Sequence, residues 1–370
     1  MTAQHKKNEM RRIVSSILLL LTVVCATAQK EYYTQVDGVQ GGAALKTALY
    51  ELIKNHKKIS YGSGEGRTWG AFYTTDAVVD NGQRRVLDMY SNEKRYFESK
   101  GTTVDGMNIE HSVAKSWWGG TKNNAYCDIH HLNPSDQNAN IRKSNFPLGE
   151  LTSVSWENGV TFVGKANIDG SSMNAYEPCD EYKGDFARVF MYMFTCYQDL
   201  TWEYTWMNYE KSTYPTLKPW AVEMLLKWHK QDPVSEKEVN RNNAVYAVQG
   251  NRNPYIDYPQ LADYAWGDSI NYVFHLTGEV KSGNGDSSCN IQQYYTNSLR
   301  FSCYKSGQME VNIYTKSRIN SGVDEMKSEP TVDASQNGKV KAIYDLQGRR
   351  LNAITEPGIY IVNGKKVIVK

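Results

Sequence analysis

The stretch DFARVFMYMFTCY, residues 185–197, has the apolar spacing of a buried helix and limits the fold more strongly than any other segment. Residues 217–250 predict two more helices, which join at QDPVS, where Asp232 and Ser235 flank Pro233 as breaker and cap. The segment ALKTALYELI predicts a packed helix near the start of the chain. These helices are expected to form the core of the scaffold.

Short apolar pieces between turn residues predict strands elsewhere in the chain. Residues 61–91 alternate such pieces with turn residues, which indicates loops and short strands. After about residue 280, the linker composition KSGNGDSS precedes the β-prone pieces YYTNSLRFSCYK and MEVNIYTKS. Residues 339–370 alternate apolar and polar positions around Asn363-Gly364, a dipeptide typical of hairpins. The predicted fold class is therefore α+β, a mostly helical scaffold with a small C-terminal β module.

The amino terminus has the pattern of a signal peptide. Four basic residues precede the apolar run Ile13–Val24, and Ala26 and Ala28 follow it as the small residues that a signal peptidase reads. We therefore expect residues 1–28 to be removed and the protein to be secreted or held at the cell surface. The apolar run is too short to span a bilayer comfortably, so no stable membrane insertion is expected.

The charge of the chain bears on its partners. The formal net charge is +2, and loss of residues 1–28 would bring it to about −1. A nearly neutral protein has no overall field that attracts phosphate. Any affinity for nucleic acid must therefore come from a local basic patch or from a metal site.

The cysteines are expected to be partly oxidised in a secreted protein. Five remain after the predicted cleavage, and Cys289 with Cys303 is a plausible local disulfide. The other three, Cys127, Cys179 and Cys196, would then supply one bridge and one buried thiol. The chain has no CxxC pair, which argues against a structural zinc site.

Residues 106–150 carry the candidate chemistry, because histidines and acids interrupt the hydrophobic pattern there. Hydrolysis of a phosphodiester needs an activated water and a cation that offsets charge on the phosphorus centre. In NIEHSVAKSWW, Glu110 can ligate a hard cation and His111 can take a proton from water. Neighbouring residues of a strand point to opposite faces, so both can serve one site only where the strand ends or twists.

A second motif, CDIHHLNPSDQNANIRKSNFPLGE, occupies residues 127–150. Pro134-Ser135-Asp136 is a helix-start signal, which places Asn140 on the first turns of a helix. The amide oxygen of Asn140 is an acceptable ligand for magnesium or calcium. Arg142 and Lys143 follow closely enough to contact the scissile phosphate or a neighbouring one.

These motifs resemble those of the bacterial endonuclease I family, secreted and periplasmic nucleases with a ββα-metal, or His-Me finger, site. EHSVAKSWW is similar to the family's EHVVPKSWF, and DIHHLNPSDQNANIRKSN to its DLHNLFPSDGxVNxxRSN. The segment LLKWHKQDPVSEKEVNRNNAVYAVQGNRNPYID resembles the family's closing helices and QGNRNPF/YID segment. The resemblance covers about residues 35–275, and we expect the catalytic domain to span 29–279. His131 replaces a frequent Asn, and Ala114 replaces a frequent Pro.

The resemblance implies roles for individual residues. Glu110 and Asn140 would be metal ligands, for Mg²⁺ or alternatively Ca²⁺ or Mn²⁺, and His111 would be the general base. Asp128 and His130 match motif positions that would support the ligands from behind. The implied reaction is hydrolysis of DNA, with RNA as a further substrate, with little sequence reading and with 5′-phosphate products.

The phosphate clamp is the role with the weakest support in the sequence. The family often takes an arginine for it from the variable loop between the motifs, where GGTKNNAY supplies only Lys122. Arg142 and Lys143 therefore stand as the candidates for this role.

The C-terminal tail resembles a second known module. VKAIYDLQGRRL and PGIYIVNGKKVIVK are similar to type IX secretion sorting domains. This resemblance implies that residues 339–370 address the protein to the secretion machinery. Residues 280–338 are predicted to be a linker and a β-prone segment without an assigned role, and the protein is expected to act as a monomer.

Two other functions fit parts of the sequence. One is a catalytically silent protein that binds nucleic acid or attaches to a surface, with residues 285–320 as the binding module. The other is a zinc hydrolase built on His111, His130 and His131, although adjacent histidines seldom share one ion. Trp117-Trp118 could stack on bases, but core packing is the better interpretation.

Overall fold

The computed structural model describes residues 30–276 and, beyond them, only the backbone of short strands between residues 279 and 369. The predicted signal peptide and the predicted pairing of Cys289 with Cys303 lie outside the described residues. By its contacts the chain divides into two units, residues 1–316 and 317–370. The domain boundaries expected from the sequence stay a prediction.

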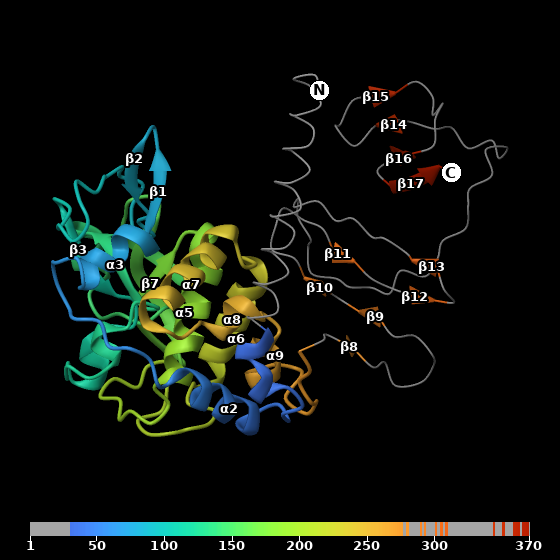
Figure 1. The fold of residues 1–370 in the computed structure, drawn as a ribbon, viewed down its shortest axis with the longest axis horizontal. Coiled ribbons are helices and arrows are strands. Elements are labelled where there is room, and N and C mark those ends of the chain that lie inside the picture. Colours follow the sequence, from blue (N-terminus) through green and yellow to red (C-terminus); the bar gives the residue numbers. More distant parts are fainter. Residues whose placement is uncertain are drawn as a thin grey trace, which may run out of the picture. The chain divides into compact units, whose positions relative to one another are not determined.

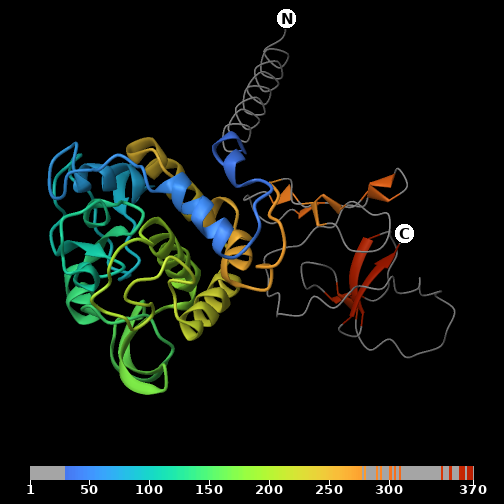
Figure 2. The ribbon, with the colours of Figure 1, turned by 90° about the horizontal axis from the view of Figure 1, so that it is seen from below.

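The helix α5 (Lys183–Cys196) is the centre of the helical core (Figure 1). It is buried from Gly184 to Cys196, and α2, α6 and α8 pack against it. Figure 2 shows α2 as the blue helix beside the yellow and orange ones. The other helices of the described part are η1 (Thr34–Val36), α2 (Ala43–Ile53), α3 (Thr68–Thr75), η2 (Lys115–Trp118), η3 (Ala125–Cys127), α4 (Gln137–Lys143), η4 (Asp180–Tyr182), α6 (Pro219–Gln231), α7 (Glu236–Gln249), α8 (Pro254–Asp257) and α9 (Leu261–Trp266). None of the described helices combines the length and apolar character needed to cross a membrane.

Local signals explain where α6 and α7 begin and end. Pro219 opens α6, where its missing N–H costs no helical hydrogen bond. Ser235 caps α7 by accepting from the Glu238 backbone N–H, and the Glu238 side chain accepts from the Ser235 N–H. Gly250 ends α7 in the left-handed conformation, with φ of 83°. The two helices and the Ser235 cap predicted from the sequence are confirmed.

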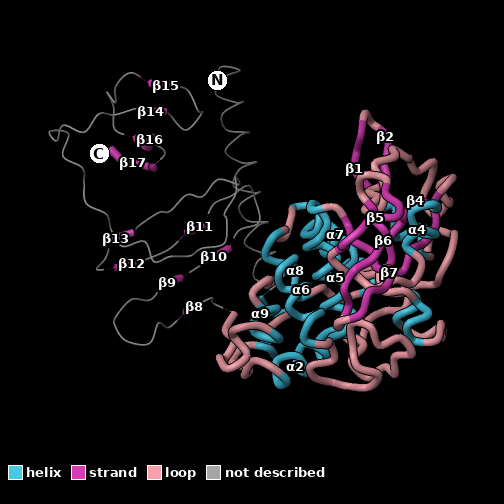
Figure 3. The backbone as a smooth tube through the Cα atoms, turned by 180° about the vertical axis from the view of Figure 1, so that it is seen from behind, coloured by secondary structure: helices cyan, strands magenta, loops and turns pink. Residues whose placement is uncertain are grey.

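Within residues 30–276 the strands form three small antiparallel sheets, which lie to one side of the helices (Figure 3). Two are strand pairs, β1 with β2 and β3 with β4, and the third has the order β5-β6-β7. The α+β fold class is therefore confirmed. The strands are β1 (Ala77–Asp80), β2 (Gln83–Val86), β3 (Met107–His111), β4 (Leu132–Asp136), β5 (Leu151–Glu157), β6 (Thr161–Ile168) and β7 (Ser171–Pro178).

The segment 61–91 contains α3, which the prediction of loops and short strands missed. Its glycines obscured the helix in the sequence. Gly70 lies inside α3 because a Cβ at this position would come within 1.9 Å of the Glu65 backbone oxygen. The apolar side chains of Trp69 and Phe72 are buried, so tertiary packing outweighs the low helix propensity of the glycine.

Two large apolar clusters, and a third small one on β6 and β7, fill the described unit. The larger surrounds α5, and it takes in Trp117 and Trp118, which are 1% and 5% exposed. Core packing is therefore confirmed for this tryptophan pair. The smaller of the two large clusters lies at β3 and β4 and includes Phe72, Leu132 and Val245. The motif-bearing strands thus have a core of their own beside the helical one.

The predicted bridge among the three cysteines of the described unit is wrong. Cys127, Cys179 and Cys196 are all free. Cys127 ends η3 and Cys196 ends α5, and both are buried in packed surroundings. The Cys196 thiol donates to the Ile53 carbonyl oxygen at 3.6 Å, as an inert structural thiol does.

The C-terminal strands form a four-stranded sheet of order β15-β14-β16-β17. β16 and β17 pair antiparallel with Val362 opposite Lys365, the register that the predicted two-residue hairpin requires. The turn Asn363-Gly364 itself lies outside the described residues. The strands after residue 276 are β8 (Glu279–Val280), β9 (Cys289–Asn290), β10 (Gln292–Gln293), β11 (Arg300–Phe301), β12 (Tyr304–Lys305), β13 (Gln308–Met309), β14 (Ile343–Tyr344), β15 (Arg350–Leu351), β16 (Gly358–Val362) and β17 (Lys365–Val369).

A buried ion pair joins α5 to the start of α7. The Arg188 guanidinium is fully buried and donates to both carboxylate oxygens of Glu238, with Nη2 2.9 Å from Oε2. Its Nη1 donates to the Asp232 backbone oxygen at 2.8 Å. Arg188 therefore fixes the turn between α6 and α7 against the central helix.

We expect Arg188→Ala to lower the free energy of unfolding by about 3–5 kcal/mol, because it leaves the buried Glu238 carboxylate without its positively charged partner. Urea unfolding measures the change. The control is Lys230→Ala, which removes an exposed ion pair with Asp263 and should cost less than about 1 kcal/mol. Equal effects of the two substitutions would contradict the structural role of Arg188.

Candidate active site

The candidate site is built on β3, β4 and α4. β3 pairs antiparallel with β4, with Glu110 opposite Asn133 and His111 opposite Leu132. α4 follows β4 directly, and the Asp136 side chain caps it by accepting from the Ala139 N–H at 2.8 Å. His111 is the last residue of β3, the strand end at which neighbouring side chains can serve one site.

Glu110, His111 and Asn140 line one open cavity of about 700 Å³. The pair comes from the end of β3, and Asn140 comes from α4. The same cavity is lined by Tyr61 and Lys115. The structure therefore brings together the three residues on which the sequence analysis centred.

Glu110 is a buried carboxylate, only 6% exposed. Burial raises the pKa of Glu110, and the nearby ammonium of Lys143 counters that effect. Lys143 Nζ lies 2.7 Å from Glu110 Oε1, although that oxygen accepts no well-aligned hydrogen bond from any described residue. Glu110 and Asn140 both line the cavity, and carboxylate and amide oxygens are donors that suit a hard cation.

His111 is held as a neutral imidazole with one nitrogen free. Its Nε2 lies 3.1 Å from the Tyr126 carbonyl oxygen, and a carbonyl can only accept, so Nε2 carries the proton. Nδ1 makes no hydrogen bond with the described residues and keeps its lone pair. Burial, with a contribution from His131, holds the pKa of His111 well below its usual value. His111 is thus a neutral imidazole at neutral pH, with the Nδ1 lone pair free.

Aromatic rings fix the orientation of the His111 imidazole. The Tyr61 ring stacks on it at 5.7 Å between centroids, and Tyr126, Trp118 and His131 lie within 6.2 Å. Sequence reasoning missed Tyr61, which lies in a loop, and Tyr126, which lies in the short helix η3, because neither segment carries a periodic pattern.

The cations predicted to contact phosphate do not line the cavity. Lys143 is 1% exposed and lies behind Glu110, and Arg142 sits over the Trp156 ring at 5.7 Å. Lys122 is also outside the cavity lining. The cavity wall instead carries Lys115, an exposed residue five positions after Glu110. Its place inside the EHSVAKSWW motif was the signal that could have identified it.

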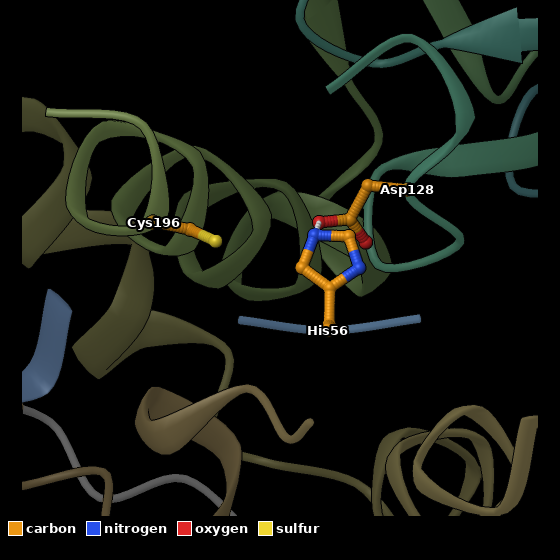
Figure 4. A group of neighbouring side chains, drawn as sticks. All are labelled: His56, Asp128 and Cys196. Atoms are coloured by element: carbon orange, nitrogen blue, oxygen red, sulfur yellow. Dashed lines mark ion pairs between the residues drawn. The ribbon is translucent and has the colours of Figure 1, made fainter. Parts of the chain in front are cut away.

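Asp128 is fully buried, and Figure 4 shows its carboxylate beside the His56 ring. Its Oδ2 accepts from the hydroxyls of Tyr192 and Tyr197, each at 2.7 Å, and its Oδ1 accepts from Gln249 at 2.7 Å and the His130 N–H at 2.9 Å. Burial alone would raise the pKa of Asp128, but nearby histidines and these hydrogen bonds lower it below its usual range. Asp128 therefore has a structural role, because its carboxylate joins α5, α7 and the segment before β4 through hydrogen bonds.

His56, Asp128 and Cys196 come close enough together to suggest a second metal site. His56 Nε2 is 3.4 Å from Asp128 Oδ2 and 2.8 Å from the Tyr197 hydroxyl. Burial raises the pKa of the Cys196 thiol well above its usual value. A cation would have to displace hydrogen bonds already made to the carboxylate and bind a protonated thiol, so this cluster fits a packed polar network better than a metal.

The structure does not assemble the zinc site considered on His111, His130 and His131. The Nε2 atoms of these residues lie near three different backbone carbonyls, those of Tyr126, Asn251 and Ala125. Their rings are thus committed to separate hydrogen bonds. Within residues 30–276 the three histidines do not form a common ligand group.

These features define a class of site. Oxygen donors suited to a hard cation, a neutral imidazole with a free nitrogen, and a lysine on the wall of an open cavity form a set suited to phosphodiester hydrolysis.

Comparison with known proteins identifies the family. The Endonuclease I family model matches residues 41–260, more than half of the chain. The chain is 36% identical over 249 residues to an extracellular ribonuclease of Bacillus amyloliquefaciens, which covers 66% of this chain and 81% of that protein. It is 34% identical over 239 residues to an extracellular ribonuclease of Bacillus subtilis (strain 168), covering 63% and 78%. It is 24% identical over 204 residues to Endonuclease-1 of Buchnera aphidicola subsp. Acyrthosiphon pisum (strain APS), covering 50% and 73%.

The chain therefore belongs to the endonuclease I family, and it is a nuclease. The resemblance seen in its two motifs is confirmed at the level of the family.

Burial makes the stability of the site region depend on pH through His131. Burial lowers the pKa of His131 to about 4, whereas the unfolded chain has a value of about 6.5. Protons therefore bind the unfolded state first. The contribution of His131 to stability is complete above about pH 6.5 and is lost as the pH falls toward 4.

The free energy of unfolding should fall between pH 7.5 and pH 5.0, and we expect this fall to be about 2 kcal/mol smaller in His131→Asn than in wild type. The reason is that the variant lacks this proton-binding group. Urea unfolding of wild type and variant at both pH values measures the difference. If the free energies of unfolding of wild type and variant differ by the same amount at both pH values, the assignment of a neutral, buried His131 is contradicted.

Proposed function

We propose that the protein is a metal-dependent endonuclease that hydrolyses phosphodiester bonds of DNA and RNA with little sequence reading. The observation that carries this proposal is the convergence of Glu110, His111 and Asn140 on one open cavity. The succession of β3, β4 and α4 supports a ββα-metal arrangement for this site.

The Glu110 carboxylate and the Asn140 amide oxygen would hold the metal ion. Mg²⁺ is the first choice, with Ca²⁺ or Mn²⁺ as alternatives, because both donors are hard oxygen atoms. A bound cation supplies charge that stabilises the transition state at phosphorus. Lys143 favours the ionised form of the buried Glu110 carboxylate and holds it in place.

His111 accepts the proton of the attacking water at Nδ1. Its Nε2–H donates to Tyr126, so the free nitrogen is fixed in direction as well as in protonation state. Lys115 binds the phosphate from the cavity wall. Attack by water that releases the 3′-oxygen leaves 5′-phosphate ends, as the family resemblance implies.

Asp128 and His130 support the site from behind. The Asp128 carboxylate accepts the His130 backbone N–H, and the His130 ring contacts the Asn251 carbonyl oxygen at 3.2 Å. These contacts fix the chain just before β4, so we assign both residues a positioning role.

The location and partners follow from the termini and from the relatives. Two relatives are named extracellular ribonucleases, which supports secretion and an RNA substrate in addition to DNA. We propose that residues 1–28 are a signal peptide and that residues 339–370 engage the type IX secretion machinery. The protein would act as a monomer.

We expect His111→Ala to lower the rate of plasmid and RNA cleavage at pH 7.5 by about 10²–10⁴-fold, because His111 is the one histidine among the described residues that line the cavity. A chelator should abolish wild-type cleavage, and added Mg²⁺ should restore it. The control is His275→Ala, which changes an exposed histidine that does not line the cavity. Full activity of His111→Ala, or of chelated wild type, would refute the mechanism.

We expect Lys115→Ala to reduce kcat/KM about 10- to 100-fold, because a charge-assisted hydrogen bond to phosphate is lost. Lys115→Arg should recover most of this loss. Lys122→Ala, which changes an exposed lysine outside the cavity lining, is the matched control and should lose less than about threefold. A larger loss for Lys122→Ala than for Lys115→Ala would move the clamp to the loop between the motifs.

A further inference from the structure

A second cavity, of about 320 Å³, lies beside the candidate active site. α4 contributes to both cavities, with Asn138 lining the second and Asn140 and Ile141 lining the first. The second cavity is lined by Ser91, Asn92, Glu93, Arg95, Asp136, Asn138, Trp156 and Asn158 and is here termed the Trp156 cavity.

The geometry of α4 places the two cavities on different sides of one helix. At 3.6 residues per turn, Asn138 and Arg142 share a face, and Asn140 lies on nearly the opposite one. Ile141 falls between them and is 65% exposed, an unusual exposure for an isoleucine. It forms an apolar crest over which a strand leaving the active site would reach the Trp156 cavity.

The Trp156 cavity has groups suited to a nucleobase. Trp156 is a half-buried residue of β5, and its indole ring lines the cavity with the Arg142 guanidinium 5.7 Å from the ring centroid. Among the described residues, the Glu93 carboxylate forms no ion pair, whereas Arg95 is paired with Asp136 and Asp88. An aromatic ring, the Glu93 acceptor and the exposed Asn138 amide match the stacking surface and the edge of a base.

We propose that the Trp156 cavity binds an unpaired base of the substrate strand, and that the enzyme therefore prefers single-stranded nucleic acid. This inference rests on the proposed function, because it places the phosphate of the same strand at His111. A base can enter the cavity and stack on Trp156 only if it has left its own stack and its pairing partner. A duplex loses those interactions on entry, whereas a single strand has fewer to lose.

Binding to the His111→Ala protein tests the proposal without requiring cleavage. The probes are a fluorescently labelled 12-nucleotide DNA and the same strand in a duplex, each titrated in the presence of Mg²⁺ and followed by anisotropy. In the His111→Ala background, Trp156→Ala should weaken single-strand binding about 5- to 100-fold, the range for loss of one stacked base, and change duplex binding less than about twofold. Equal weakening of both probes, or no weakening of either, would overturn the proposal.

Three further variants guard against a general loss of structure. Trp156→Phe should recover most of the single-strand affinity, because phenylalanine also stacks on bases. Trp220→Ala removes another half-buried tryptophan, which lines neither cavity, and should leave the single-strand preference unchanged. Asn138→Ala, at an exposed position, should weaken single-strand binding about threefold even if Trp156→Ala fails to fold. An unchanged single-strand affinity in Asn138→Ala would count against the proposal.

Cleavage mapping separates this inference from the proposed function. Wild-type enzyme acting on a single strand with one abasic nucleotide should show a suppressed cut at a fixed distance from the missing base, and Trp156→Ala should cut there as it does elsewhere. No cleavage of any probe by wild type would refute the proposed function, while the binding comparison would still decide the role of Trp156.

Discussion

The site depends on one buried carboxylate. Asp128 accepts hydrogen bonds from Tyr192 on α5, from Tyr197 just after it, and from Gln249 at the end of α7. It also accepts the His130 N–H, two residues before β4 begins. The helical core and the motif-bearing strands meet at this group. Removing it would leave several buried donors without partners and release the strand that positions α4.

Burial raises the pKa of Glu110, and Lys143, buried beside it, opposes that effect. Both side chains come from the elements that carry the site, Glu110 from β3 and Lys143 from the last turn of α4. Their ion pair holds α4 against the strand. The sequence suggested a phosphate contact for Lys143, and the burial of the residue favours this internal role instead.

The local patterns in the sequence predicted the helices well, because α5, α6 and α7 carry strong apolar periodicity and clear caps. They did not predict α3, where Gly70 is required by a close backbone approach. The convergence of Glu110, His111 and Asn140 could be anticipated, because short motifs fix a strand end and a helix start. The surroundings of His111 could not be anticipated, because Tyr61 reaches it from a loop and Tyr126 from the short helix η3, and tertiary packing sets the position of both segments.

One short helix links the chemistry to the proposed selection of the substrate strand. α4 carries Asn140 toward the active-site cavity and Asn138 toward the Trp156 cavity, and its position is fixed by the Asp136 cap. Arg95 Nη2 lies 2.7 Å from Asp136 Oδ2 and holds this capping side chain in place. A strand that occupies the Trp156 cavity therefore contacts the same rigid element that presents the proposed metal ligand. In this proposal, binding of the base helps to align the phosphate, because α4 contacts both. The preference for a single strand then follows without any reading of sequence.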